Sequence, residues 1–307
     1  MLIVVALGGN ALLRRGQALT AENQRENART AAAALARILR DGHDLVITHG
    51  NGPQVGLLAL QGLAHKPDEA YPLDILGAET EGMIGYLIEQ ELENALDHDR
   101  TVATLLTQVR VDPDDPAFAA PTKFVGPVYD RAEAEQMAER NGWSIAPDGD
   151  RWRRVVASPA PVEIPDLKVI RQLLGHGTVV ICAGGGGIPV VARPDGGLTG
   201  VEAVIDKDAA SALLAEALGA DGLLMLTDVE GILRDFGTED AERIDHLTPQ
   251  EVHALDLPDG SMGPKAAAAA RFATSGPGRW AAIGKLDDAA GLVAGETGTR
   301  VSAVLSD

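Results

Sequence analysis

The sequence predicts an α/β fold in which a mainly parallel sheet is covered by helices on both faces. Strand and helix patterns alternate along the 307 residues, which is typical of a doubly wound sheet. Apolar residues make up 45% of the chain and aromatic residues only 3%, so Ala, Leu, Val and Ile must fill the core. That composition suits a parallel sheet packed against Ala-rich helices. No period of 20–50 residues repeats, which argues against a solenoid.

The N-terminal third contains three predicted strands and three predicted helices. Apolar, β-branched runs predict strands at 2–7, 45–48 and 102–109. Helices are expected at 20–40, 54–63 and 73–97. Thr20 suits an N-cap, Gly42 suits the residue that ends a helix, and Pro53 suits a first helical turn.

The middle of the chain has a different composition. Eight of the 17 prolines fall between positions 112 and 165. A structureless loop of that length is uncommon in a compact domain. We therefore expect a small subdomain with one helix near 130–140 and a hairpin around 148–149. Arg151, Arg153 and Arg154 give this region a basic patch in an otherwise acidic chain.

The alternation then continues to the end of the chain. Helices are expected at 166–174 and at 208–218, and a third, which residues 261–265 open, is expected to run to about 274. Strands are expected at 178–182, 222–227, 280–283 and 299–304. A hairpin is expected around 194–197. Thr248 with Glu251 forms the capping-box signature of a short helix.

Charge and cysteine content limit the classes of partner. The net charge of −19 argues against nucleic acid and against an anionic membrane surface. Cys182 is the only cysteine, which excludes an internal disulfide and a cysteine-cluster metal site, and its apolar run places it in the core. The apolar start of the chain is too short to span a membrane and lacks a basic leader pattern. We expect a cytoplasmic protein with no membrane or nucleic-acid partner.

Four predicted strand ends carry residues suited to an anion. They are Gly-Gly-Asn at 8–10, Gly-Asn-Gly at 50–52, four glycines at 184–187, and Asp-Lys-Asp at 206–208. In an open α/β sheet, ligands bind at the carboxyl ends of the strands. Any one of these segments is equally an ordinary tight turn. The four together predict a locally positive site, most simply for phosphate.

The two commonest phosphate-binding patterns are absent. The dinucleotide pattern that starts at Gly184 requires a glycine at 189, where the chain has Pro189. The P-loop pattern requires Ser or Thr after Gly284-Lys285, where the chain has Leu286. The glycines therefore need another explanation.

Lys207 and Lys265 stand near the starts of two predicted helices. A lysine there opposes the helix dipole unless an anion binds at the same place. Each lysine alone fits a solvated surface position, but the pair indicates a site. Asp208 is expected to hold ammonium groups in place or to contact a metal. His49 is interpreted as structural more readily than as a direct participant.

Seven segments together resemble the carbamate kinase family, which has the amino acid kinase fold. The resemblance runs from residue 2 to about residue 300. The segments are LGGNAL at 7–12, THGNGPQVG at 48–56, RRVVASP at 153–159, ICAGGGGIPV at 181–190, GVEAVIDKD at 200–208, LTDV at 226–229 and GSMGPK at 260–265.

The resemblance implies an open αβα sandwich forming one unit over 1–307. An N-terminal lobe, about 1–205, would bind carbamate and phosphate and carry a protruding subdomain at about 111–158. A C-terminal lobe, about 206–307, would bind nucleotide. The implied reaction is ATP + carbamate = ADP + carbamoyl phosphate, used to make ATP in arginine catabolism, with Mg²⁺ carried by the nucleotide phosphates. The family is typically homodimeric.

The resemblance also implies roles for individual residues, which fall into three groups. The catalytic group is Lys207, Lys265, Asp208 and Lys123, the last in the protruding subdomain. The substrate- and phosphate-binding group is Gly8, Gly9, Asn10, Gly50 and Asn51. The nucleotide-binding group is Thr227, Asp228, Val229, Met262 and Pro264.

Two departures from the family pattern affect the protruding subdomain. Phe124 and Ala157 stand where many relatives have proline, so we expect them to affect the stiffness of this region rather than the chemistry. Two alternatives stay open. One is another acylphosphate-forming amino acid kinase, or a nucleoside monophosphate kinase, of the same fold. The other is a nucleotide-sensing module without activity.

Overall fold

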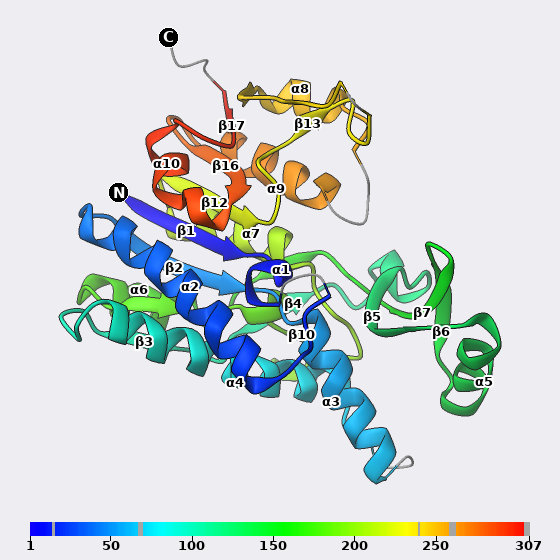
Figure 1. Cartoon of the computed structure of the whole chain (residues 1–307). Coiled ribbons are helices and arrows are strands. Elements are labelled where there is room, and N and C mark those ends of the chain that lie inside the picture. The colour runs from blue at the N-terminus through cyan, green and yellow to red at the C-terminus, as the bar shows by residue number, and fades with distance from the viewer. Residues whose placement is uncertain (14–15, 67–69, 239, 258–261, 304–307) are drawn as a thin grey trace.

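The computed structural model describes residues 1–13, 16–66, 70–238, 240–257 and 262–303 (Figure 1), and of Asn10 and Ala11 it describes the backbone alone. The main sheet has eight strands in the order β15-β17-β16-β12-β1-β2-β9-β3. Its neighbouring strands pair in parallel except β16 with β17. The strands are β1 (Leu2–Leu7), β2 (Asp44–His49), β3 (Val102–Thr104), β9 (Val179–Ile181), β12 (Gly222–Thr227), β15 (His246–Leu247), β16 (Trp280–Lys285) and β17 (Thr299–Ser302).

Helices cover both faces of this sheet, as the sequence predicts. In β1, Val4 and Ala6 join one buried cluster, whereas Ile3, Val5 and Leu7 join the other, because successive strand side chains point to opposite faces. One cluster is completed by α6 (Leu167–Gly175), α7 (Lys207–Leu218), α8 (Pro249–Ala254) and α9 (Met262–Thr274). The other is completed by α2 (Ala21–Arg40), α4 (Leu73–Ala95) and α10 (Ala289–Ala294). The αβα sandwich is confirmed.

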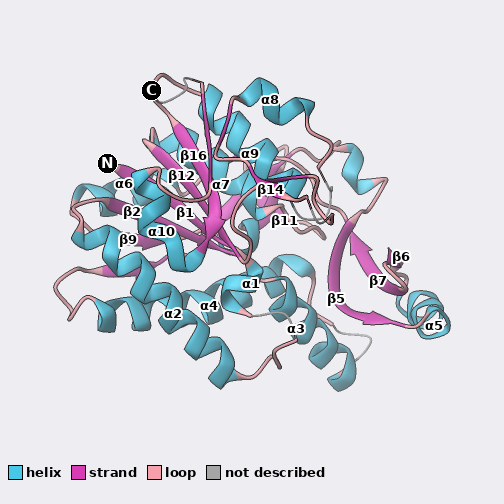
Figure 2. Ribbon diagram, turned by 45° about the horizontal axis from the view of Figure 1, so that its top comes forward, coloured by secondary structure: helices cyan, strands magenta, loops and turns pink. Residues whose placement is uncertain are grey.

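Smaller sheets lie beside the sandwich. One three-stranded antiparallel sheet has the order β5-β7-β6, and α5 packs on it. Figure 2 shows these elements standing apart from the main sheet. They are β5 (Lys123–Tyr129), α5 (Arg131–Asn141), β6 (Ser144–Asp148) and β7 (Arg151–Val156), which confirms the expected helix and hairpin. A four-stranded sheet contains β11 (Leu198–Gly200), β10 (Ile188–Ala192), β4 (Gln108–Val111) and β8 (Pro161–Glu163). A two-stranded sheet pairs β13 (Leu233–Arg234) with β14 (Glu242–Arg243).

The single strand predicted at 102–109 is wrong. The chain leaves the main sheet after β3 and enters the four-stranded sheet at β4. The break falls at Thr107, whose amide donates to the buried Glu81 carboxyl group at 2.9 Å and whose hydroxyl donates to Leu105 O at 2.9 Å. Those bonds replace the ladder that a continuous strand would form. Apolar alternation alone cannot show such a break, because both halves are partly buried strands.

Two further helices begin at strand ends. They are α1 (Gly9–Leu12) after β1 and α3 (Gly52–His65) after β2. Thr20 caps α2 by accepting from the Asn23 amide, and the Thr248–Glu251 capping box is present at α8. Among the helices described, none is both long and apolar enough to cross a bilayer.

Candidate active site

The carboxyl ends of β1, β2 and β12 meet at one edge of the sheet. The Gly8 amide donates to Leu226 O at 2.8 Å, and the Gly50 amide donates to Leu7 O at 3.0 Å. A Cβ on Gly8 would lie 2.7 Å from Leu226 O, and one on Gly50 would lie 3.2 Å from the Gly9 amide nitrogen. Backbone packs on backbone here, so a side chain is excluded at Gly8 and crowded at Gly50. Gly8, Gly9 and Gly50 are therefore brought together as the sequence predicts, while the Asn10 side chain lies outside the described part of the chain.

Asp208 joins two lysines from different helices. It is the second residue of α7, and its side chain is 4% exposed. Lys207 Nζ lies 2.5 Å from Asp208 Oδ1, and Lys265 Nζ lies 3.1 Å from Asp208 Oδ2. Two ammonium groups share one carboxylate, so the cluster keeps a net positive charge. The Lys207 side chain also reaches the glycine loops, since a Cβ on Gly50 would lie 3.5 Å from Lys207 Cδ.

The environment affects the protonation of this cluster. Burial lowers the pKa of Lys265 below its ordinary value, and the Lys207 charge lowers it further, while Asp208 opposes both effects. Two cations in a partly dry site repel each other. An anion bound between them would relieve that repulsion, so the cluster favours binding of a negatively charged group.

Asp206 connects this cluster to the small three-stranded sheet. Its Oδ1 caps α7 by accepting from the Asp208 and Ala209 amides at 2.9 and 3.1 Å. Its Oδ2 accepts from Lys123 Nζ at 2.6 Å. Burial opposes ionisation of Asp206, but the Lys123 ammonium outweighs it and holds the pKa of that carboxyl well below its usual range. Asp206 belongs to the Asp-Lys-Asp segment of the predicted anion site but has no predicted role of its own, although its N-cap position before Lys207 is a readable signal.

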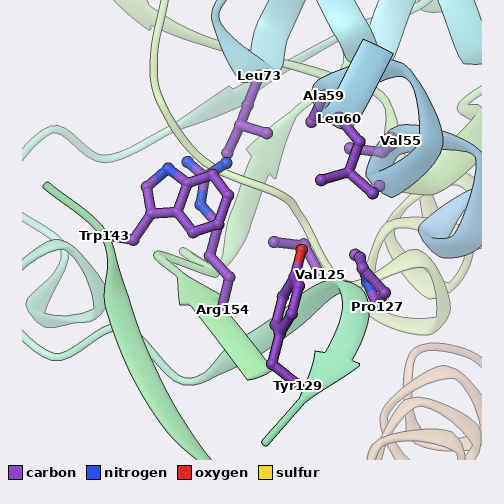
Figure 3. A pocket seen from close by; sticks show the side chains of 11 residues that line it. Val55, Ala59, Leu60, Leu73, Val125, Pro127, Tyr129, Trp143 and Arg154 are labelled. Carbon is purple, nitrogen blue, oxygen red and sulfur yellow. The ribbon is translucent and has the colours of Figure 1, made fainter. Parts of the chain in front are cut away.

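Close packing at α3 fixes the place of Lys123. A Cβ on Gly56 would lie 2.3 Å from Gly126 Cα, so α3 and β5 touch backbone to backbone. Beside this contact is the apolar cavity of Figure 3, where Trp143 stacks on the Arg154 guanidinium at 4.7 Å. The cavity is separate from the lysine cluster. Arg154 also pairs with Glu202 at 3.2 Å, which ties β7 to the segment that precedes α7.

The four glycines at 184–187 approach protein atoms. A Cβ on Gly184 would lie 2.3 Å from the His49 ring, and a Cβ on Gly185 would lie 2.0 Å from Asn51 Nδ2. Gly185, Gly186 and Gly187 all have positive φ. The run is therefore a buried turn that supports Asn51, rather than an open cradle. Burial lowers the pKa of His49 to about 4, so this ring is neutral at pH 7 and structural, as expected.

The residues expected on the nucleotide side lie in two places. Thr227 ends β12, and Asp228 and Val229 follow it. A Cβ on Gly8 would lie 3.6 Å from Thr227 Cα, so this group adjoins the glycine loops. Met262 and Pro264 lie in the first turn of α9, just before Lys265.

Cys182 is buried in the core, where burial raises the pKa of its thiol. Its interpretation as a core residue is confirmed.

The geometry suits transfer of an anionic group. Backbone amides, two lysines and a carboxylate that orients them can hold and neutralise a phosphoryl group. The His49 ring is buried and directed at the Gly184 turn. The site thus consists of charged side chains and backbone amides, which suits a nucleophile that is already ionised.

Comparisons with known proteins agree with this geometry. The sequence profile of the amino acid kinase family matches residues 1–279. A carbamate kinase of Rhizobium meliloti (strain 1021) is 55% identical over 309 residues, covering 100% of this chain and 95% of the relative. A carbamate kinase of Escherichia coli (strain K12) is 52% identical over 300 residues, covering 98% of this chain and 99% of the relative. The solved structure of Giardia lamblia carbamate kinase bound to AMP-PNP superposes with a TM-score of 0.89 at 38% identity, covering 98% of each chain.

Proposed function

The chain belongs to the carbamate kinases of the amino acid kinase family, and we propose that it catalyses reversible phosphoryl transfer between ATP and carbamate, with ADP and carbamoyl phosphate as the other pair. The observation that carries this proposal is the Lys207–Asp208–Lys265 cluster beside the glycine loops of β1 and β2. The full-length identity to carbamate kinases disfavours another acylphosphate-forming kinase and an inactive sensor.

The mechanism follows from the charge of the nucleophile. Carbamate is an oxygen anion, so no proton has to be removed and no catalytic base is needed. Phosphoryl transfer then depends on in-line positioning and on neutralising the equatorial oxygens of the transferred group. Lys207 and Lys265 supply the positive charge. Asp208 fixes both ammonium groups, so little reorganisation is needed when the charge on the phosphoryl group shifts.

We propose that the remaining residues take the roles that the family resemblance implies. Gly8, Gly9 and Gly50 would offer backbone amides to phosphate oxygens, and Asn10 and Asn51 would bind the substrate from adjacent loops. Thr227, Asp228 and Val229 would contact the nucleotide after β12. Met262 and Pro264 would contact it from the start of α9, and Lys123 would reach the substrates from β5. The proximity of Gly8 to Thr227 supports a nucleotide phosphate at that edge.

Mg²⁺ would be held by the nucleotide phosphates. Both oxygens of Asp208 are engaged by lysines, so this carboxylate is not available as a ligand. The metal would bring bound water and charge neutralisation to the β- and γ-phosphates. The lysines of this chain act on the same phosphates from the protein side.

We also propose that two lobes of the chain bind different substrates. The lobe at about 1–205, with its protruding subdomain at about 111–158, would bind carbamate, and the lobe at about 206–307 would bind nucleotide. The Lys207–Asp208 pair at that boundary supports this division. We further propose a cytoplasmic homodimer that makes ATP in arginine catabolism, as the family resemblance implies. Light scattering of the purified protein tests the dimer.

A direct assay tests the activity. The purified chain with carbamoyl phosphate, ADP and Mg²⁺ should form ATP, measured by coupling to hexokinase. Replacing carbamoyl phosphate with acetyl phosphate or aspartyl phosphate should lower kcat/KM strongly. Equal use of these acylphosphates would favour a different amino acid kinase.

A further inference from the structure

Two successive buried residues of α4 lie behind the substrate-binding loops and have no role in the proposed mechanism. Thr80 is 0% exposed and Glu81 is 1% exposed. In the sequence they sit in an Asp/Glu-rich helix, where carboxylates are normally solvated. Their burial therefore requires a structural or functional reason.

Thr80 holds the Asn51 side chain. Asn51 Nδ2 donates to Thr80 Oγ1 at 2.9 Å, and that hydroxyl donates back to its own helix at Gly77 O or Leu76 O. Asn51 follows Gly50, which touches Gly9 and Lys207. The hydroxyl of Thr80 thus fixes the carboxamide at the edge where the substrate phosphate is proposed to bind.

Glu81 holds the turn that lies under Asn51. Its Oε2 accepts from the Thr107 amide at 2.9 Å. Thr107 in turn binds both ends of the turn at 183–187. Its hydroxyl accepts from the Ala183 amide at 3.0 Å, and its carbonyl accepts from the Ile188 amide at 2.8 Å. Gly184 lies directly against the Glu81 side chain, and Gly185 lies against Asn51.

We propose that Thr80 and Glu81 are positioning residues for the substrate-binding edge: Thr80 fixes the Asn51 carboxamide, and Glu81 fixes the turn on which that carboxamide rests. This inference rests on the proposed function, because it assigns these residues to support of the same phosphate site. Neither residue touches the reacting atoms, so both act through Asn51.

The surroundings of Glu81 keep it neutral at pH 7. Burial raises the pKa of Glu81 to about 8, although amide donors from Thr107 and Gly184 act in the opposite direction. The titratable groups around it are the neutral His49 ring on β2, the Cys182 thiol after β9 and the Asp166 carboxylate before α6. None of these three supplies a positive charge, so an ionised Glu81 would be buried without compensation.

Ionisation of Glu81 should therefore weaken the site. A buried negative charge beneath Asn51 would repel the anionic substrate and draw water or polar groups toward itself. The protonated form is the supporting one. Carbamoyl phosphate should bind less well as pH rises through about 8, in addition to any effect of lysine titration.

The first test compares pH profiles of wild type and Glu81→Gln. Gln cannot ionise but keeps a carbonyl oxygen for the Thr107 amide. Between pH 7 and pH 9, kcat/KM for carbamoyl phosphate should fall about tenfold more in wild type than in Glu81→Gln, because a group is about nine-tenths ionised one unit above its pKa. Glu91→Gln is the matched control. Glu91 lies on α4 ten residues after Glu81, is also buried, and pairs with Arg29. It should follow the wild-type profile.

The second test separates the hydroxyl of Thr80 from its bulk. Thr80→Val should raise KM for carbamoyl phosphate by about fivefold to tenfold, the effect of one lost hydrogen bond, with a smaller change in kcat. Thr80→Ser restores the hydroxyl and should restore KM. Superimposable pH profiles of wild type and Glu81→Gln, or an unchanged KM in Thr80→Val, would overturn the inference. If wild type forms no ATP at all, the proposed function fails instead, so the two failures are distinguishable.

Discussion

Lys123 Nζ lies 2.6 Å from Asp206 Oδ2, although the two residues are 83 positions apart in the chain. Lys123 begins β5 of the outlying sheet, and Asp206 is the N-cap of α7, which carries Lys207 and Asp208. This ion pair joins the outlying sheet to the helix that presents the site lysine. A change in either residue should therefore affect both the stability of α7 and the geometry of the site.

Asp206 variants separate its two roles. Asp206→Asn keeps an N-cap acceptor and loses the charge that binds Lys123, whereas Asp206→Ala loses both. We expect Asp206→Ala to be about 1 kcal/mol less stable than Asp206→Asn, the usual value of an N-cap. Both variants should lose ATP formation to a similar extent, because both release Lys123. Urea unfolding and the coupled assay measure these effects. Equal stability of the two variants would argue against the capping role.

Single substitutions of Lys207 and Lys265 should affect turnover rather than folding. In either Lys207→Ala or Lys265→Ala, Asp208 keeps the other lysine as a partner. We expect each variant to unfold within about 1 kcal/mol of wild type and to lose about 10²–10³ in kcat, comparable to loss of an oxyanion donor. Lys168→Ala, an exposed lysine on α6, serves as the control and should keep full activity. Retained turnover in either site variant would contradict the assigned role.

The double variant Lys207→Ala/Lys265→Ala should be strongly non-additive in stability. It leaves the buried Asp208 carboxylate without either cation, and stranding one partner of a buried pair costs about 3–5 kcal/mol. A double-mutant cycle on the free energy of unfolding measures this coupling. Additive behaviour would mean that Asp208 finds compensation elsewhere.

Gly56→Ala tests the joint between α3 and the outlying sheet. The new methyl group would lie 2.3 Å from Gly126 Cα, so β5 must move away and carry Lys123 from Asp206. We expect a marked loss of kcat/KM. Gly62→Ala on the same helix meets nothing within 4 Å and should be neutral or slightly stabilising. Matching activities of the two variants would show that this joint does not position Lys123.

The stability of the chain should fall as pH rises from about 5 to about 8. Burial raises the pKa of Glu81 from 4.5 to about 8, so the folded chain holds a proton that the unfolded chain releases above pH 4.5. Its stabilising contribution is complete below pH 4.5 and is lost progressively as pH rises from 4.5 through 8, by on the order of 5 kcal/mol in total. Glu81→Gln should lack this loss between pH 5 and pH 9. Thermal unfolding of both proteins checks it, and His49 contributes equally to each.

The sequence predicts the sandwich because its signals are local. The alternation at β1 and β2, the Thr20 cap and the Thr248–Glu251 box depend on neighbouring residues alone. The Lys207–Asp208 pair is likewise visible at the start of its helix. Glu81 could not be predicted, because its burial depends on the distant Thr107 and Gly184.

The glycine run at 184–187 also shows what the sequence alone could not predict. Its sequence indicates close approach, but only the fold shows that His49, Asn51 and Ile205 are what it approaches.

The coupled assay of ATP formation from carbamoyl phosphate and ADP tests the central claim most directly. Wild type should form ATP rapidly, and Lys207→Ala should lose about 10²–10³ in kcat under the same conditions. Absence of ATP formation by the folded wild-type chain in the presence of Mg²⁺ would contradict it.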